Sequence, residues 1–90
     1  MMEMILAFLA TINCYPTAEI KIEGDTTYYR NGVVYIAPHM YKDHILVHEL
    51  VHDCQYQKHG VAKSRREWIN RERHAMHIET MFLEQQNYPR

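Results

Sequence analysis

Five consecutive residues near the middle of the chain, His48-Glu49-Leu50-Val51-His52, form an H-E-x-x-H motif that constrains the fold more than any other feature. They lie in a segment that favours a helix from about Asp43 to Lys58. Two histidines four positions apart lie on one face of a helix, so their imidazoles can bind the same metal ion. Glu49 lies beside such an ion, where its carboxylate can take a proton from an activated water molecule. The rest of the chain has to supply a further ligand and a cavity.

The length and charge of the chain narrow the classes of protein to consider. Its 90 residues suit a single domain, residues 1–90, with a modest core that a bound metal can stabilise. Ten basic residues against eleven acidic residues give a net charge of −1. This balance gives no electrostatic reason to expect binding to nucleic acid or to an anionic membrane.

The pattern of residues predicts an α+β domain with a small three-stranded antiparallel sheet. The expected elements are a helix from Met2 to about Asn13, strands at Glu19–Glu23, Thr26–Arg30 and Val33–Ala37, the motif helix, and a last helix to about Gln86. Asn31-Gly32 predicts a hairpin, because both residues tolerate the positive φ of a type I′ turn. Asp43 is the expected N-cap of the motif helix, and Ser64 to Glu67 form an S-x-x-E capping box. The end of the chain, Asn87 to Arg90, is expected to fray.

The first residues allow two interpretations. Met4 to Ala10 are apolar, as in the core of a signal peptide, but Glu3 stands where such a peptide carries positive charge. The run is too short to span a bilayer. A packed first helix in a cytoplasmic protein is favoured, and the alternative is that residues 1–18 are a signal peptide of an exported protein.

The two cysteines, Cys14 and Cys54, are 40 positions apart and form no C-x-x-C zinc motif. We expect two buried thiols, with a disulfide as the alternative.

A catalytic zinc site usually has three protein ligands and a water molecule, so a third ligand is needed. The inward face of the last helix carries Glu72 and Glu79, seven positions apart in an otherwise apolar stripe. An unpaired carboxylate on a buried face costs free energy. We expect Glu72 to bind the metal and Glu79 to accept an N–H from His48 or His52, with Glu79 as the alternative ligand. The alternative without a metal is that both glutamates form ion pairs with Lys or Arg.

Other side chains near the motif are weaker candidates for ligands. His59 lies two helical turns beyond His52, roughly 10 Å away, and Glu67 is assigned to the capping box. His74 and His77 fall on the solvent side of the last helix. His44 is expected at the surface, and its alternative roles are a metal ligand or a side chain that supports the ligands. Trp68 lies on the inward face of the last helix and is expected to pack in the core.

The motif together with a glutamate on the next helix resembles the gluzincin metallopeptidases, and the short layout is similar to the minigluzincins. The segments His48–Gln55 and Trp68–Ala75 also resemble small metallopeptidases of bacteria and phages. The resemblance covers about Asp43 to Leu83. It implies a zincin-like fold, one Zn²⁺ ion and hydrolysis of a peptide or protein substrate.

The roles carried over by this resemblance fall on four residues. His48, His52 and Glu72 would hold the zinc ion, and Glu49 would act as the general base. A zinc-stabilised structural or binding module of phage origin, without turnover, is the alternative function, because 90 residues leave little material for a deep cleft. A further alternative is an accidental motif in a small helical protein.

Two parts of the expected mechanism remain open in the sequence. Larger gluzincins carry a downstream His or Tyr that polarises the substrate, and this chain has no clear counterpart. The candidates for that role are Tyr28, Tyr35, His39 and Tyr41. A substrate peptide is expected to pair with an exposed edge of the sheet, at Val33–Ala37.

Overall fold

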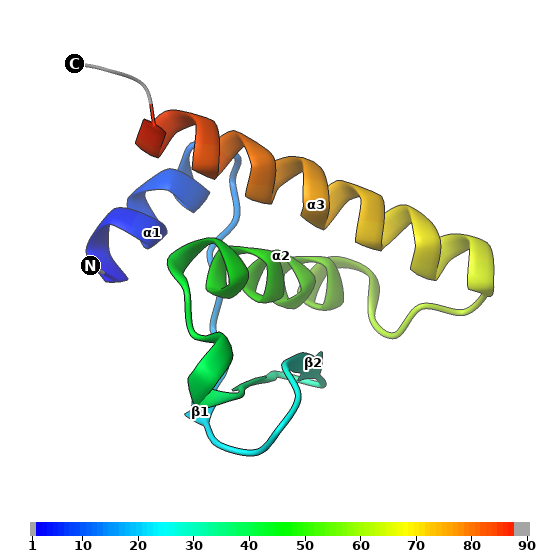
Figure 1. The fold of residues 1–90 in the computed structure, drawn as a ribbon. Coiled ribbons are helices and arrows are strands. Elements are labelled where there is room, and N and C mark those ends of the chain that lie inside the picture. Colours follow the sequence, from blue (N-terminus) through cyan, green and yellow to red (C-terminus); the bar gives the residue numbers. More distant parts are fainter. Residues whose placement is uncertain (1, 88–90) are drawn as a thin grey trace.

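The computed structural model describes residues 2–87, and in this range the chain forms helices and a three-stranded sheet (Figure 1). The elements in order are α1 (Met2–Ala10), β1 (Glu19–Ile22), β2 (Tyr28–Arg30), β3 (Val33–Ile36), the 3-10 helix η1 (Pro38–Met40), α2 (Asp43–His59) and α3 (Arg65–Asn87). The predicted α+β class is confirmed. Of the four terminal residues expected to fray, Asn87 ends α3, and residues 88–90 lie outside the described range.

The sheet is mixed, so the prediction that all three strands are antiparallel was wrong. β3 lies in the centre, antiparallel to β2 and parallel to β1. The predicted turn between β2 and β3 is present, and Asn31 and Gly32 have φ values of 44° and 93°. β1 carries Glu19 and Lys21 and β2 carries Arg30, whereas β3 has no charged residue. Charged strands suit the edges of a sheet, so the apolar strand takes the centre.

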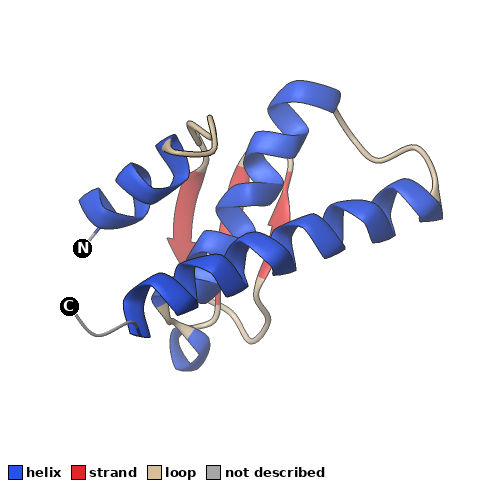
Figure 2. Ribbon diagram, turned by 90° about the horizontal axis from the view of Figure 1, so that it is seen from above, coloured by secondary structure: helices blue, strands red, loops and turns tan. Residues whose placement is uncertain are grey.

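Helix α2 is the central element of the domain, and it lies between the sheet and α3 (Figure 1). Seen from above, α3 crosses in front of α2 and the strands lie behind it (Figure 2). The buried face of β3 contributes Val34 and Ile36 to the core, and α1 contributes Ile5 and Leu9; all four are fully buried. The rings of Phe8 in α1 and Phe82 in α3 meet edge to face at 5.2 Å. Helix α1 therefore packs against the C-terminal half of α3.

The ends of α2 and α3 differ slightly from the predicted caps. Asp43 lies inside the first turn of α2, and Lys42 takes the N-cap position without a side-chain hydrogen bond. A carboxylate in the first turn still interacts favourably with the helix dipole. In α3 the Ser64 hydroxyl accepts the N–H of Glu67 at 3.1 Å, as the capping box requires. The Glu67 carboxylate accepts the N–H of Lys63, not that of Ser64.

Asp53, the residue after the motif, joins α2 to the strands. Its side chain is buried and accepts hydrogen bonds from the backbone N–H groups of Thr17 and Ala18, at 2.7 and 3.1 Å. The hydroxyl of Tyr29 in β2 donates to the same carboxylate at 2.5 Å, and Gln57 donates at 3.0 Å. Burial and this carboxylate raise the pKa of Tyr29 well above its usual range. One carboxylate thus sets the positions of β1 and β2 relative to the motif helix.

Cys14 and Cys54 form a disulfide, so the expectation of two buried thiols was wrong. After α1 the chain turns at Asn13, which has a φ of 60°, and this turn brings Cys14 against α2. The two Cα atoms are 5.7 Å apart, within the ordinary range for a disulfide. The bond ties the segment after α1 to the motif helix.

Removing this disulfide is expected to lower the free energy of unfolding by about 3–4 kcal/mol, because it closes a long loop in the unfolded chain. The measurement is urea denaturation of the Cys14→Ala/Cys54→Ala variant beside the wild type, each with and without reductant. Reductant should destabilise the wild type and leave the variant unchanged. Equal stabilities of the oxidised wild type and the variant would contradict this prediction.

Candidate metal centre

His48 and His52 lie one turn apart on the face of α2 that is turned toward α3 and the cavity. Their Nε2 atoms are 3.3 Å apart and their ring centroids 4.9 Å apart. Both side chains are largely buried. The helical spacing in the sequence therefore brings the two imidazoles together as predicted.

Glu72 of α3 faces this histidine pair. Its Oε1 atom lies 2.5 Å from Nε2 of His52 and 3.3 Å from Nε2 of His48. One ligand atom from each of the three residues lies within 4.8 Å of the other two. The structure thus confirms that Glu72 meets both histidines, in a group that could hold a metal ion.

Two of the three separations among these ligand atoms have the length expected around a zinc ion. With bonds of roughly 2.0–2.1 Å, two ligands at a tetrahedral angle are about 3.3–3.4 Å apart. The His48–His52 and His48–Glu72 separations, both 3.3 Å, match this value, whereas the 2.5 Å between Nε2 of His52 and Oε1 of Glu72 is shorter than two zinc ligands allow. Two imidazole nitrogens and one carboxylate oxygen also form a donor set that zinc accepts.

Glu79 lies on the other side of the His48 ring. Its Oε1 atom is 2.9 Å from Nδ1 of His48, and its Oε2 atom is 2.7 Å from Nδ1 of His44. A carboxylate at Nδ1 favours the tautomer whose proton lies on that nitrogen, which leaves Nε2 free to bind a metal. His44 was expected at the surface, but it is partly buried and bound to this carboxylate.

Gln55 plays the corresponding part for His52. Its Oε1 atom lies 2.8 Å from Nδ1 of His52, and its Nε2 donates to the backbone carbonyl of Arg71 at 3.0 Å. The donation to Arg71 identifies Nε2 as the amide nitrogen, so Oε1 accepts the proton of His52 Nδ1. Both histidines are therefore held with Nε2 turned toward Glu72. The sequence alone did not show this contact.

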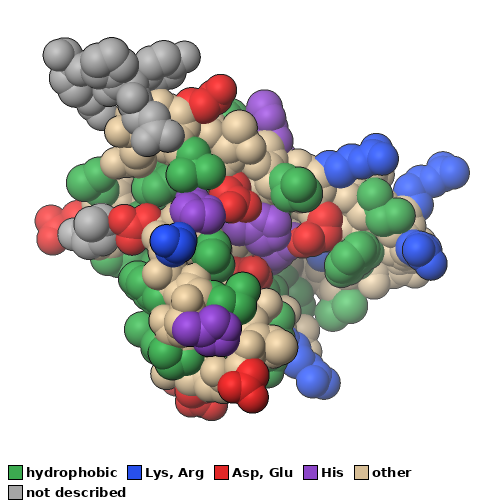
Figure 3. All heavy atoms as spheres, in the orientation of Figure 1, with side chains coloured by type: hydrophobic (Ala, Val, Ile, Leu, Met, Phe, Trp, Pro, Cys, Tyr) green, Lys and Arg blue, Asp and Glu red, His purple; other side chains and the backbone are tan. Residues whose placement is uncertain are grey.

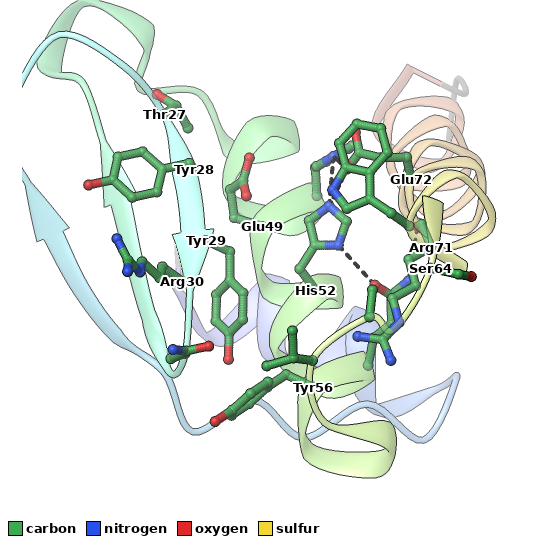
Figure 4. A pocket seen from close by; sticks show the side chains of 16 residues that line it. Thr27, Tyr28, Tyr29, Arg30, Glu49, His52, Tyr56, Ser64, Arg71 and Glu72 are labelled. Atoms are coloured by element: carbon green, nitrogen blue, oxygen red, sulfur yellow. Dashed lines mark hydrogen bonds and ion pairs between the residues drawn. The ribbon is translucent and has the colours of Figure 1, made fainter. Parts of the chain in front are cut away.

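Glu49 lies beside the histidines at the floor of an open cavity of about 460 Å³ (Figure 4). Its residue is 8% exposed, and it lines the cavity together with His48, His52 and Glu72. Burial raises the pKa of Glu49, while the two histidines lower it and the other two glutamates raise it further. Glu49 and the three residues of the ligand cluster thus line the same cavity. Over this side of the molecule, histidine and acidic side chains gather near the centre (Figure 3).

The walls of the cavity carry several exposed apolar side chains. Trp68, predicted to pack in the core, is 58% exposed and lines the cavity with Val61 and Tyr28. The core contacts of α3 are made by Ala75, Ile78 and Phe82, from the middle of the helix onward. The first turns of α3 therefore extend past the core, so an apolar residue there faces the cavity.

The open questions of the mechanism are only partly answered by the geometry. Tyr28 lines the cavity, but its hydroxyl points away from Glu49 (Figure 4). Its ring stacks on Tyr35, with centroids 4.7 Å apart. Tyr35, His39 and Tyr41 are not among the lining residues. No candidate for the substrate-polarising role reaches the cluster in this structure.

The prediction that Val33–Ala37 forms an exposed edge of the sheet, where a substrate could pair, was wrong. β3 is paired on both sides, whereas β2 has a free edge, and all three residues of β2 line the cavity. The remaining histidines of this region, His59, His74 and His77, do not belong to the ligand cluster. His74 lies 3.2 Å from the Gln55 amide, and burial lowers its pKa.

Comparisons with known proteins add no relatives to this picture. The chain matches no protein-family model, and no curated protein or solved structure is significantly similar to it. Across residues 2–87, no helix is both long enough and apolar enough to cross a membrane.

Proposed function

We propose that the protein is a zinc-dependent peptidase, with His48, His52 and Glu72 as the metal ligands and Glu49 as the general base. The observation that carries the proposal is the convergence of three ligand atoms beside a buried carboxylate at the floor of an open cavity. The hydrogen bonds that His48 donates to Glu79 and His52 donates to Gln55 further support it, because such contacts orient metal ligands.

The chemistry can be divided between the metal and the chain. When bound by two histidines and a glutamate, zinc lowers the pKa of water to about 7 and polarises a carbonyl group. Glu49 would take the proton of the attacking water and return it to the leaving amine. Burial raises the pKa of Glu49, which makes its carboxylate a stronger base.

The free edge of β2 is the place where a substrate would lie. Within residues 2–87 its backbone groups have no partner strand on the cavity side, so an extended peptide could add to the sheet there. Such a peptide would pass over Glu49 and the histidines. Trp68 and Val61 on the opposite wall offer apolar surface to its side chains.

A structural zinc module is less well supported by the geometry. Structural zinc sites are usually closed by four protein ligands. The group in the described part of the chain has three members and adjoins a cavity, which leaves room for water and substrate. A buried carboxylate next to the ligands also has no role in a structural site.

Metal removal and replacement test this function. The purified protein should cleave members of a mixed peptide library, lose the activity on dialysis against a chelator, and regain it with one equivalent of zinc. Mass spectrometry of the products would report cleavage, and native mass spectrometry the bound metal. Zinc binding without any cleavage would favour the structural module, and a protein that does not bind zinc would refute both.

A further inference from the structure

A second cavity, of about 580 Å³, lies between the C-terminal half of α2, the first half of α3 and the segment after α1. Its volume is in the range of sites for small organic molecules. It shares Gln55 and Arg71 with the cavity at the metal centre. Gln55 bonds His52 at one end of its amide, and the Arg71 carbonyl and His74 at the other. This side chain is a common wall between two differently lined spaces.

The lining of the second cavity combines an apolar part with a basic part. The apolar part consists of Ile12, Val51 and the Cys14–Cys54 disulfide. The basic part consists of Lys58, His59, Lys63, Arg71 and His74. The two lysines and Arg71 bring three positive charges to this cavity, in a chain whose net charge is −1.

The charges of the two lysines are not neutralised by other side chains. Within residues 2–87, neither Lys58 nor Lys63 forms an ion pair. Glu67 is the one carboxylate among the lining residues, and it already binds Arg71 at 2.6 Å and the N–H of Lys63 at 3.1 Å. Two ammonium groups at this cavity are therefore available to an anion.

We propose that the second cavity binds a small organic carboxylate with an apolar body. The carboxylate would lie at Lys58 and Lys63, and the apolar body against Ile12, Val51 and the disulfide. Ammonium groups bind carboxylates through charge-assisted hydrogen bonds, and the apolar lining gains from burial of a hydrocarbon chain. The proposal does not rest on the peptidase activity, since it uses neither the ligand cluster nor Glu49, although Gln55 lines both cavities.

Octanoate is a suitable probe, with octylammonium as the probe of opposite charge. Titration of zinc-free protein should be followed by ¹H–¹⁵N NMR, so that binding can be assigned to a place in the chain. Octanoate should shift the amide signals around Asn13, Lys58 and His74 more than those around Glu49. Octylammonium should leave them largely unchanged. Octanoate shifts centred on Glu49, or no binding with a Kd below about 10 mM, would overturn the proposal.

A charge-matched pair of variants separates this site from general electrostatic attraction. Lys58→Gln/Lys63→Gln should weaken octanoate binding about five- to tenfold, because each exposed ion pair contributes modestly. Arg66→Gln/Arg73→Gln removes the same charge from residues that do not line this cavity, and should leave the affinity unchanged. Equal losses in both variants would contradict a specific site. All four side chains are exposed, so neither variant removes core contacts.

Discussion

Replacing Glu49 with glutamine is expected to lower the rate of peptide hydrolysis by about 10²–10⁴-fold while zinc remains bound. Glutamine has almost the same shape as glutamate but cannot accept the proton of water. The three proposed ligands are unchanged in this variant, so its zinc stoichiometry should equal that of the wild type. The measurement is kcat/KM on one cleaved peptide, beside native mass spectrometry of each protein.

A Glu84→Gln variant is a matched control for this experiment. Glu84 is exposed in α3 and does not line the cavity, so the same chemical change there should leave the rate unaltered. Loss of folding is not expected for Glu49→Gln. Because the pKa of Glu49 is raised in the folded protein, its ionisation opposes folding above the usual range of a glutamate, and a neutral side chain relieves this effect. Hydrolysis at the wild-type rate would refute Glu49 as the base.

Glu72→Gln is expected to reduce zinc affinity more strongly than Glu79→Gln. Glu72 is the proposed ligand, so its replacement should weaken binding by more than about 100-fold. Among the proposed ligands, Glu79 contacts only His48, at the nitrogen that faces away from the metal, and loss of such a supporting contact typically costs about 10–100-fold. Competition with a chelating dye of known zinc affinity would give the zinc dissociation constants of the wild type and of the two variants.

The two variants also test which of the two glutamates binds the metal and which one supports a ligand. Both substitutions remove one carboxylate from the same helix, so each controls for the charge change in the other. If Glu79→Gln abolished zinc binding while Glu72→Gln retained it, the ligand assignment would be wrong by two helical turns. If neither variant changed the affinity, a His–His–Glu site would be untenable.

The parts of the centre that follow from helical periodicity could be predicted from the sequence. The spacing of His48 and His52 sets their geometry directly. Two acids in an apolar stripe indicated that α3 faces the motif with Glu72 and Glu79, and both reach the histidines in the structure. These contacts depend only on the packing of α3 against α2, which the periodicity of the two helices is sufficient to predict.

The features that were not predictable depend on contacts between distant segments. The parallel pairing of β1 with β3 reflects a choice between sheet edges, which local turn signals do not determine. The disulfide requires α1 to pack where it does, and the exposure of Trp68 requires knowledge of where the core ends along α3. Asp53 follows the motif directly, yet its partners lie at Thr17, Ala18 and Tyr29.

The disulfide divides the chain into two parts of different character. The covalent loop that it closes contains the whole sheet, both histidines and Glu49, whereas Glu72 lies outside this loop on α3. α3 follows α2 after a short connection and is held to it by packing. A metal ion bound by residues of α2 and α3 would be a second cross-link, and a reversible one. Binding and release of the metal would change how firmly α3 is held to α2, while the disulfide keeps the sheet and α2 in one covalent loop.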